Sequence, residues 1–197
     1  MDLRIAFFGD SFVTGFGDPD TRGWVGRVCA AATARGHVVT CYNGGIRRNT
    51  SADVLARWHD EASHRLPPEH PRALVFSFGV NDCLVEGSQR RVEQAASVAN
   101  ARQILTDATA MAPTLMIGPP PIADAGVNAR VGALIPELQA VCRDLSVPFL
   151  DVFAVLQSSS AWMREAAASD GAHPARGGYQ TLADLINRWP PWRAWLP

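Results

Sequence analysis

Short apolar segments of the strand-forming type alternate along the whole chain with longer segments that have helical periodicity. The expected strands are residues 3–9, 37–42, 73–78, 114–117 and 148–152. The expected helices are residues 23–35, 51–66, 88–111, 128–145 (with a late start or kink at Pro136), 160–168 and 175–188. This order is typical of βαβ units around a parallel sheet, whose two faces must both be covered by helices. We therefore expect an α/β fold with three layers, an α/β/α sandwich on a five-stranded parallel sheet.

The length and composition fit an ordinary soluble protein. We expect a single domain over residues 1–197, in which hydrophobic residues make up 47% and charged residues 19%. The formal net charge of -1, without a basic run, gives no electrostatic surface for nucleic acid. The apolar runs are too short for membrane insertion, and the N-terminus lacks the features of a signal peptide. A cytoplasmic protein is expected on these grounds.

The four cysteines give no support to a metal or redox site. Cys29, Cys41, Cys83 and Cys142 are far apart in the sequence and form no C-x-x-C pair. Three of them lie in apolar segments and are expected to be buried. Cys83 lies close to Asn81, so it is either a reactive thiol or a buried inert side chain, and the second interpretation is favoured.

The first expected strand ends abruptly in Gly9-Asp10-Ser11. In open α/β sheets, clefts form outside the carboxyl ends of the strands, so this ending places a hydroxyl at such a cleft. Ser11 is therefore a candidate nucleophile if a base lies nearby. Alternatively, Ser11 is only the N-cap of a helix, a position that serine commonly occupies.

Two further segments place chemically competent side chains at or near the same edge of the sheet. Asp170 precedes His173 by three residues in a loop, a spacing that lets the carboxylate hold the imidazole in one tautomer. Asn81 follows the third strand and has an amide that can donate to a developing oxyanion. Taken alone, the Asp170 and His173 pair is better explained by a surface turn, and Asn81 can be explained by an Asx-turn. Together with Ser11, they indicate acyl-transfer chemistry.

Four sequence blocks carry a resemblance to a known family. They are Gly9-Asp10-Ser11, residues 43–50, residues 79–82 and residues 170–174. In this order, and over nearly the whole chain, they resemble the SGNH hydrolase superfamily, also called GDSL esterases/lipases. The Gly-Pro-Pro-Pro turn at residues 118–121 is also similar to that family. The resemblance implies a flavodoxin-like sandwich with strand order 2-1-3-4-5.

The resemblance also implies a role for each candidate residue. Ser11 is similar to the family's nucleophile, His173 to its general base and acid, and Asp170 to the carboxylate that orients the histidine. The implied oxyanion hole consists of the backbone N–H groups of Ser11 and Arg48 and the side chain of Asn81. The implied activity is the hydrolysis of carboxylic esters through an acyl-enzyme, with no metal and no organic cofactor.

Arg48 departs from the family pattern. The family pattern N-x-x-x-x-G-x-T aligns with residues 43–50 and has glycine where this chain has Arg48. The asparagine and threonine of the pattern are both present, as Asn43 and Thr50. A backbone N–H donates whatever its side chain is, so the oxyanion hole can survive the change. The arginine side chain either narrows the cleft and meets a polar or anionic substrate group, or lies in solvent. The sequence leaves these two alternatives open.

Other functional classes fit the sequence less well. The G-x-S-x-G motif of α/β-hydrolases is incomplete around Ser11, and a dinucleotide-binding glycine is missing at Asp20. A metallophosphoesterase using Asp10, Asn81 and His173 would need more clustered ligands. A catalytically silent SGNH-like binding module and an acyltransferase remain alternatives. Within the esterase interpretation, short-chain or acetyl esters are favoured over lysophospholipids and thioesters.

The C-terminal segment is unusually rich in tryptophan. Trp189, Trp192 and Trp195 lie within seven residues of one another. They either pack on the chain's own domain, which is favoured, or form a contact with a second copy or a membrane surface. The expected partners are accordingly a small-molecule ester substrate and, at most, a second copy of the chain; a monomer and a homodimer both fit.

Overall fold

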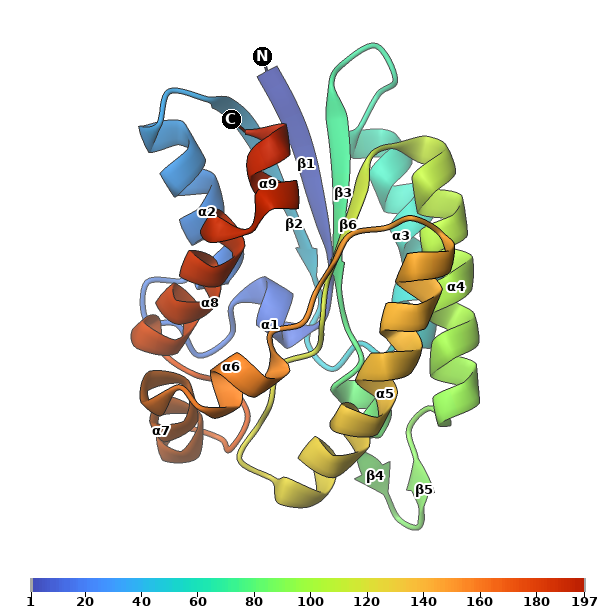
Figure 1. The fold of residues 1–197 in the computed structure, drawn as a ribbon, viewed down its shortest axis with the longest axis vertical. Coiled ribbons are helices and arrows are strands. Elements are labelled where there is room, and N and C mark those ends of the chain that lie inside the picture. The colour runs from blue at the N-terminus through green and yellow to red at the C-terminus, as the bar shows by residue number, and fades with distance from the viewer. Residues whose placement is uncertain (1, 197) are drawn as a thin grey trace.

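The structure, a computed structural model, describes residues 2–196 and is built on a parallel sheet (Figure 1). Its strands are β1 Asp2–Gly9, β2 Val38–Gly45, β3 Arg72–Ser77, β6 Thr114–Ile117 and β7 Phe149–Leu150. They lie in the order β2-β1-β3-β6-β7, and all neighbouring pairs are parallel. Since β6 and β7 are the fourth and fifth strands of this sheet in chain order, the predicted order 2-1-3-4-5 is confirmed.

Helices cover both faces of the sheet and make the expected three layers (Figure 1). One face carries α2 Gly23–Ala34, α8 Arg176–Arg188 and α9 Pro190–Trp195, beside which α6 Phe153–Gln157 and α7 Ser160–Ala168 pack. The other face carries α3 Ser51–Arg65, α4 Gln94–Met111 and α5 Ala125–Asp144. A short helix, α1 Ser11–Thr14, follows β1 directly.

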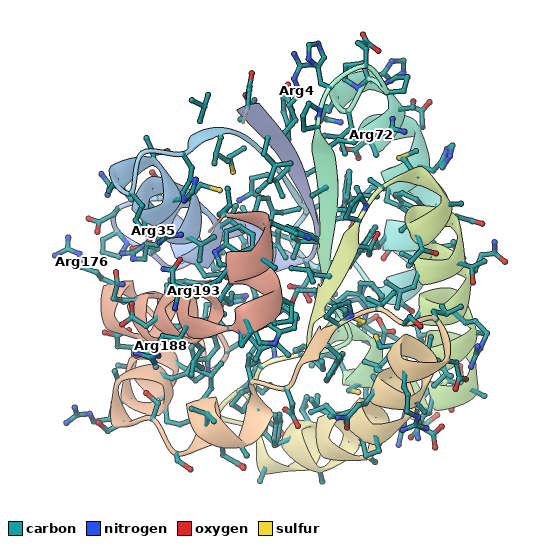
Figure 2. All side chains as sticks on the ribbon, turned by 45° about the horizontal axis from the view of Figure 1, so that its top comes forward. Arg4, Arg35, Arg72, Arg176, Arg188 and Arg193 are labelled. Carbon is teal, nitrogen blue, oxygen red and sulfur yellow. The ribbon has the colours of Figure 1, made fainter. Side chains whose placement is uncertain are left out.

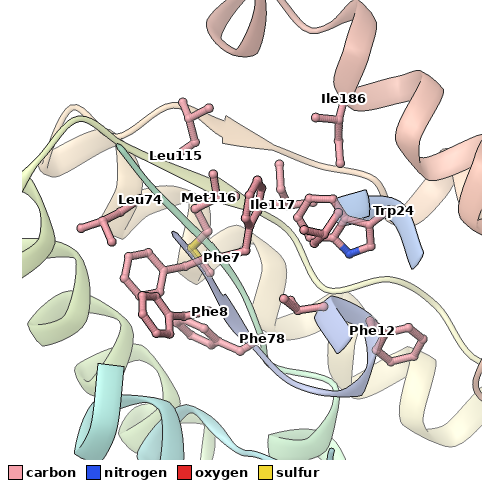
Figure 3. Packing of buried hydrophobic residues seen from close by; sticks show 14 of the residues in the cluster. Phe7, Phe8, Phe12, Trp24, Leu74, Phe78, Leu115, Met116, Ile117 and Ile186 are labelled. Carbon is pink, nitrogen blue, oxygen red and sulfur yellow. The ribbon is translucent and has the colours of Figure 1, made fainter. Parts of the chain in front are cut away.

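The internal strand β1 shows why both layers are needed. Successive side chains of a strand point to opposite faces, and Phe7 and Phe8 are both fully buried. Phe7 packs edge-on against Trp24 of α2, whereas Phe8 packs against Trp58 of α3. Figure 3 shows part of this core, with Trp24 and Leu74 on opposite sides of the sheet. A strand that buries both faces positions its carboxyl end rigidly, and Ser11 follows that end.

The C-terminal segment packs on its own sheet, as the sequence favoured. Trp192 of α9 is 1% exposed and lies with its ring 6.2 Å from the ring of Phe7. Trp195 is partly buried beside it, at 6.2 Å between ring centroids. The last turn of the chain is therefore part of the core. Within residues 2–196, no helix is long and apolar enough to cross a membrane.

The structure corrects several predicted boundaries, among them the strand predicted at residues 148–152, which is only Phe149–Leu150. Residues 43–45, predicted as loop, extend β2 to Gly45, because Gly44 and Gly45 pair with the end of β1. The helix predicted from residue 88 begins only at Gln94; before it, a hairpin of β4 Val85–Glu86 and β5 Gln89–Arg90 turns at Gly87, whose φ is 66°. The helix predicted from residue 128 begins at Ala125, where the Asp124 side chain caps it, and continues through Pro136.

Candidate active site

Ser11 begins α1 immediately after β1 and is 5% exposed. The N-cap of α1 is Asp10, whose Oδ1 accepts the backbone N–H of Phe12 at 2.9 Å. The capping role considered for Ser11 therefore belongs to Asp10, and the Ser11 hydroxyl is left for another partner. The turn is tight enough that a side chain at Gly9 would collide with the carbonyl oxygen of Ser77 on β3.

The partner of Ser11 is His173, which lies 162 residues later in the loop between α7 and α8. Nε2 of His173 lies 2.7 Å from Oγ of Ser11, and its Nδ1 lies 2.7 Å from Oδ2 of Asp170. Asp170 also accepts the backbone N–H groups of Ala172 and His173 through its Oδ1, at 3.0 and 2.9 Å. The structure thus brings together the three residues that the sequence proposed as a triad.

The charge of Asp170 is stabilised by these contacts. Partial burial alone would raise the pKa of the Asp170 carboxyl, but the hydrogen bonds from His173 and Ala172 outweigh it and lower the pKa to about 2. Asp170 is therefore ionised throughout the neutral range. An ionised carboxylate at Nδ1 keeps a proton on that nitrogen and leaves Nε2 free to accept one from Ser11.

Aromatic side chains hold the His173 ring in place. The ring of Phe12 lies 4.8 Å from it, and Phe16 meets it edge-on at 4.9 Å. Phe12 is in turn stacked on the buried ring of Trp162, and the carbonyl of Phe16 accepts the hydroxyl of Tyr179 at 2.7 Å. The imidazole is consequently oriented by packing as well as by its two hydrogen bonds.

Glu165 of α7 fixes the segment that follows His173. Its carboxylate accepts the backbone N–H groups of Ala175, Gly177 and Gly178, at 2.9, 3.0 and 2.7 Å. These are otherwise unpaired groups at the start of α8, where a negative charge is also favoured by the helix dipole. Glu165 therefore anchors the end of the loop that carries Asp170 and His173.

We expect Glu165→Ala to lower the free energy of unfolding by about 2 kcal/mol, because three charge-assisted hydrogen bonds are lost. It should also lower kcat, since His173 is three residues from the released helix start. Urea unfolding and kinetics with a simple ester measure both effects. Arg164→Ala, at an exposed position on the same helix, is the matched control. Equal stability of the two variants would contradict the anchoring role.

The three groups predicted to bind an oxyanion all line one cleft with Ser11 and His173. Among residues 2–196, the backbone N–H groups of Ser11 and Arg48 donate to no other protein group. Nδ2 of Asn81 donates to the carbonyl of Asn49 at 3.0 Å and has a longer contact of 3.4 Å to Oδ2 of Asp10. Within the described residues, the cleft therefore offers two unpaired backbone N–H groups and the side-chain amide of Asn81. One N–H of that amide is held only by the longer contact to Asp10.

Arg48 occupies the position expected for glycine in both sequence and conformation. Its φ is 66°, in the left-handed region that favours glycine. Its side chain is 70% exposed and pairs with Glu86 of the β4–β5 hairpin at 2.7 Å. Of the two alternatives left open by the sequence, the structure favours the one in which this side chain lies in solvent at the cleft rim.

The conformation of Arg48 gives a stability prediction. We expect Arg48→Gly to be more stable than Arg48→Ala by about 1 kcal/mol, because alanine keeps the strain of a left-handed backbone and glycine removes it. The exposed ion pair with Glu86 is lost equally in both variants, so it cancels. Urea unfolding of the two variants tests this prediction. If Arg48→Ala is as stable as Arg48→Gly or more stable, as it would be in a helix, the left-handed conformation of residue 48 is contradicted.

A buried polar network lies behind the site and was missed by sequence reasoning. Asp82 accepts the backbone N–H of Ser51 at 2.7 Å and the hydroxyl of Ser97 at 2.6 Å. Burial, with the nearby charge of Asp82, raises the pKa of the Asp10 carboxyl to about 7. Both aspartates stand next to predicted site residues in the sequence. That adjacency was the only available signal.

Arg57 of α3 is a second residue that the sequence did not indicate. Its guanidinium donates to the carbonyls of Gly9 and Gly44, at 3.1 and 2.8 Å, and to Oδ1 of Asn49 at 2.7 Å. It therefore ties the carboxyl ends of β1 and β2 to the loop that carries Arg48. In the sequence, Arg57 is simply a polar residue on an amphipathic helix.

The cleft has a volume of about 300 Å³, and its walls come from widely separated segments. Ala172 also lines the cleft, and the lining residues not yet described are Arg47, Val80, Leu84 and Ile122. A larger and more apolar cavity of about 400 Å³ lies at the other end of the sheet, beside Leu3 and Trp195. Its lining includes none of the candidate catalytic or oxyanion-binding residues, so the chemistry points to the smaller cleft.

The other candidate chemistries find less support. Burial raises the pKa of the Cys83 thiol to about 11, as expected for a thiol that is 2% exposed and inert. Within residues 2–196, no group of three or more His, Cys, Asp or Glu side chains is placed to hold a metal ion. Contrary to expectation, Cys41 is exposed, because it lies on the edge strand β2.

Several solved structures of esterases and lipases are similar to this chain over nearly its whole length. A lipase/acylhydrolase from Enterococcus faecalis has a similar structure, with a TM-score of 0.78 and 25% identity over 98% of this chain and 97% of that one. The acetylxylan esterase Axe2 from Geobacillus stearothermophilus has a TM-score of 0.76 and 19% identity, covering 94% and 92% of the two chains. A lipolytic G-D-S-L protein from Veillonella parvula has a TM-score of 0.75 and 18% identity, covering 93% and 96%.

A search of curated protein sequences gives no match. The sequence model of the GDSL-like lipase/acylhydrolase family matches residues 7–181, which contain all the site residues described above. The resemblance inferred from the four sequence blocks is thereby confirmed. The chain belongs to the GDSL-like lipase/acylhydrolase family, and it is a carboxylic ester hydrolase.

Proposed function

We propose that the protein is a serine esterase in which Ser11 is the nucleophile, His173 the general base and acid, and Asp170 the carboxylate that orients His173. The observation that supports this most strongly is the chain of two 2.7 Å contacts from Oγ of Ser11 through His173 to Asp170. Nucleophile, base and orienting group in such contact are the minimum set for acyl transfer. No metal or organic cofactor enters the proposed reaction.

The first half of the reaction forms an acyl-enzyme. Nε2 of His173 takes the proton from the Ser11 hydroxyl as Oγ attacks the ester carbonyl carbon. The carbonyl oxygen becomes an oxyanion that accepts hydrogen bonds from the N–H groups of Ser11 and Arg48 and from Asn81. His173 then gives its proton to the ester oxygen, the carbon–oxygen bond breaks, and the alcohol leaves.

The second half removes the acyl group. Nε2 of His173 takes a proton from water, and the resulting hydroxide oxygen attacks the acyl carbon while the same donors hold the new oxyanion. The bond to Ser11 breaks, Oγ recovers its proton from His173, and the carboxylic acid leaves. Asn81 takes part by turning its second N–H from Asp10 toward the oxyanion, which the 3.4 Å length of that contact favours.

Short-chain esters, acetyl esters among them, are the proposed substrates. The cleft volume of about 300 Å³ is at the lower end of the range for small-molecule sites, which favours small esters over long-chain ones. Among the similar structures are those of an acetylxylan esterase, including catalytic mutants in which alanine replaces an aspartate, a histidine or a serine. These are the three residue types that meet in the present cleft. Lysophospholipids, thioesters and acyl acceptors other than water remain alternatives, because the same acyl-enzyme serves them all.

A series of p-nitrophenyl esters tests the proposal on substrate size. We expect kcat/KM to be highest for acetate and butyrate and to fall steeply from octanoate to palmitate, because the longer chains exceed the cleft. Initial rates at fixed pH, below the micelle-forming concentrations of the long esters, give the comparison. Values that rise toward palmitate would contradict the short-chain assignment while leaving the serine mechanism intact.

A further inference from the structure

Arg47 is the one positively charged side chain of the cleft that residues 2–196 leave without a counter-charge. Arg48 pairs with Glu86 at 2.7 Å, and Asp170 is held by His173. Among residues 2–196, no carboxylate pairs with Arg47, and its guanidinium donates no hydrogen bond to the protein. A guanidinium that lines a cleft without an ion pair or a hydrogen bond to the protein can bind an anionic group of a ligand.

The position of Arg47 is fixed by stacking. Its guanidinium carbon lies 3.5 Å from the centroid of the Phe16 ring. Phe16 itself is held by its edge-on contact with His173 and by the hydrogen bond from Tyr179 to its carbonyl. Arg47 comes from the segment after β2 and lines the cleft, whereas Phe16 comes from the segment after α1, so the stacked pair ties these two segments together.

Stacking uses the flat face of a guanidinium and leaves its edge free. The N–H groups of an arginine all lie in the guanidinium plane and form a fork that fits a carboxylate or another oxyanion. Held over Phe16, the fork of Arg47 is pre-organised, so less side-chain entropy is lost when an anion binds. A substrate that is neutral throughout would leave this group with water alone.

We propose that the cleft selects esters that carry an anionic group, typically a carboxylate, and that Arg47 binds this group. The inference rests on the proposed function, because the ester of the same molecule must reach Ser11. It transfers to Arg47 the anion-binding role that the sequence raised for Arg48, whose guanidinium already pairs with Glu86. Since Arg47 is exposed, its contribution should be moderate and sensitive to salt.

Two pairs of substrates test the inference. In the first pair the charge lies on the alcohol side: 4-acetoxybenzoate is compared with the neutral 4-acetoxybenzamide. In the second it lies on the acyl side: the phenyl monoester of adipic acid is compared with its terminal amide. Within each pair the shape is nearly constant, so the ratio of the two kcat/KM values reports on the charge. Comparing variants of one protein cancels the intrinsic reactivity of each ester.

The variants are Arg47→Gln, which removes the charge, Arg47→Lys, which keeps the charge and loses the fork, and Arg35→Gln. Arg35 lies on the surface near the end of α2, away from the cleft, and serves as the control for net charge (Figure 2). We expect the anionic-to-neutral ratio to fall about tenfold in Arg47→Gln for at least one pair, with Arg47→Lys intermediate. Arg35→Gln should keep the wild-type ratio. Added salt should lower the ratio in the wild type and leave it nearly unchanged in Arg47→Gln.

The outcomes separate this inference from the proposed function. Ratios that are the same in wild type and Arg47→Gln for both pairs would overturn the role of Arg47, even in an active esterase. If none of the four esters is hydrolysed, it is the proposed function that fails. In that event, binding of 4-hydroxybenzoate and 4-hydroxybenzamide, followed by NMR, decides the role of Arg47. A preference for the carboxylate that Arg47→Gln loses supports it, and equal binding to both proteins overturns it.

Discussion

Ser11→Ala is expected to lower kcat for p-nitrophenyl acetate by roughly 10⁵-fold, to a level set by the oxyanion donors and binding alone. The reason is chemical: without Oγ there is no acyl-enzyme, and His173 has no hydroxyl to deprotonate at 2.7 Å. The backbone N–H of residue 11 remains in place. The residual rate should therefore still exceed hydrolysis in water.

The structural cost of Ser11→Ala should be small. The substitution removes one hydroxyl from a position that is 5% exposed and breaks one side-chain contact, so the near-ultraviolet circular dichroism should be unchanged. Ser158→Ala, at an exposed position after α6, is the matched control and should keep wild-type turnover. Turnover of Ser11→Ala within tenfold of the wild type would remove Ser11 from the mechanism.

Asp170→Asn should have the second-largest effect, a loss of about 10²- to 10⁴-fold in kcat. The asparagine oxygen can still accept the backbone N–H groups of Ala172 and His173, so the loop should keep its shape. The amide nitrogen, however, donates to Nδ1 of His173 and forces the proton onto Nε2. That tautomer cannot accept a proton from Ser11. The range reflects the 43% exposure of the Asp170 side chain, since water can partly replace the lost charge.

The pH dependence follows from the pKa of Asp170. Because contacts in the folded protein lower this pKa to about 2, the ionised carboxylate stabilises the fold above the unfolded value of about 3.8. That stabilisation is lost as the pH falls from about 4 through 2. The wild-type rate should therefore show no step from Asp170 above pH 4. Activity in Asp170→Asn that equals the wild type at pH 7 would contradict the orienting role.

The sheet and its order were predictable because burial dictates them. Strands such as β1, buried on both faces, read as continuous apolar runs in the sequence, and helices between them imply parallel pairing. The hairpin at Val85–Arg90 was not predictable from the same pattern. Its strands are two residues long, and the sequence around it has the polar composition of a helix start. The result was a helix placed six residues too early.

The candidate site was predictable only in part. Ser11, Asn81, Asp170 and His173 follow strand ends or stand in short motifs, and their residue types carry chemistry by themselves. Arg47 differs, because its significance depends on Phe16, which is 31 positions away in a separate loop, and on Glu86, which pairs with its neighbour Arg48. Arg57 likewise acts through carbonyls of β1 and β2 that no sequence pattern associates with it. Such long-range pairings become visible only in three dimensions.

Covalent labelling with a fluorophosphonate tests the central claim most directly, because the reagent reacts with a serine only where a base and oxyanion donors activate it. The proposed mechanism predicts one adduct per chain in the intact mass, mapped to the peptide that contains Ser11. It also predicts that Ser11→Ala blocks labelling and that His173→Ala slows it strongly. Absence of an adduct in folded wild-type protein, or an adduct at another serine that persists in Ser11→Ala, would contradict the claim that Ser11 is the nucleophile.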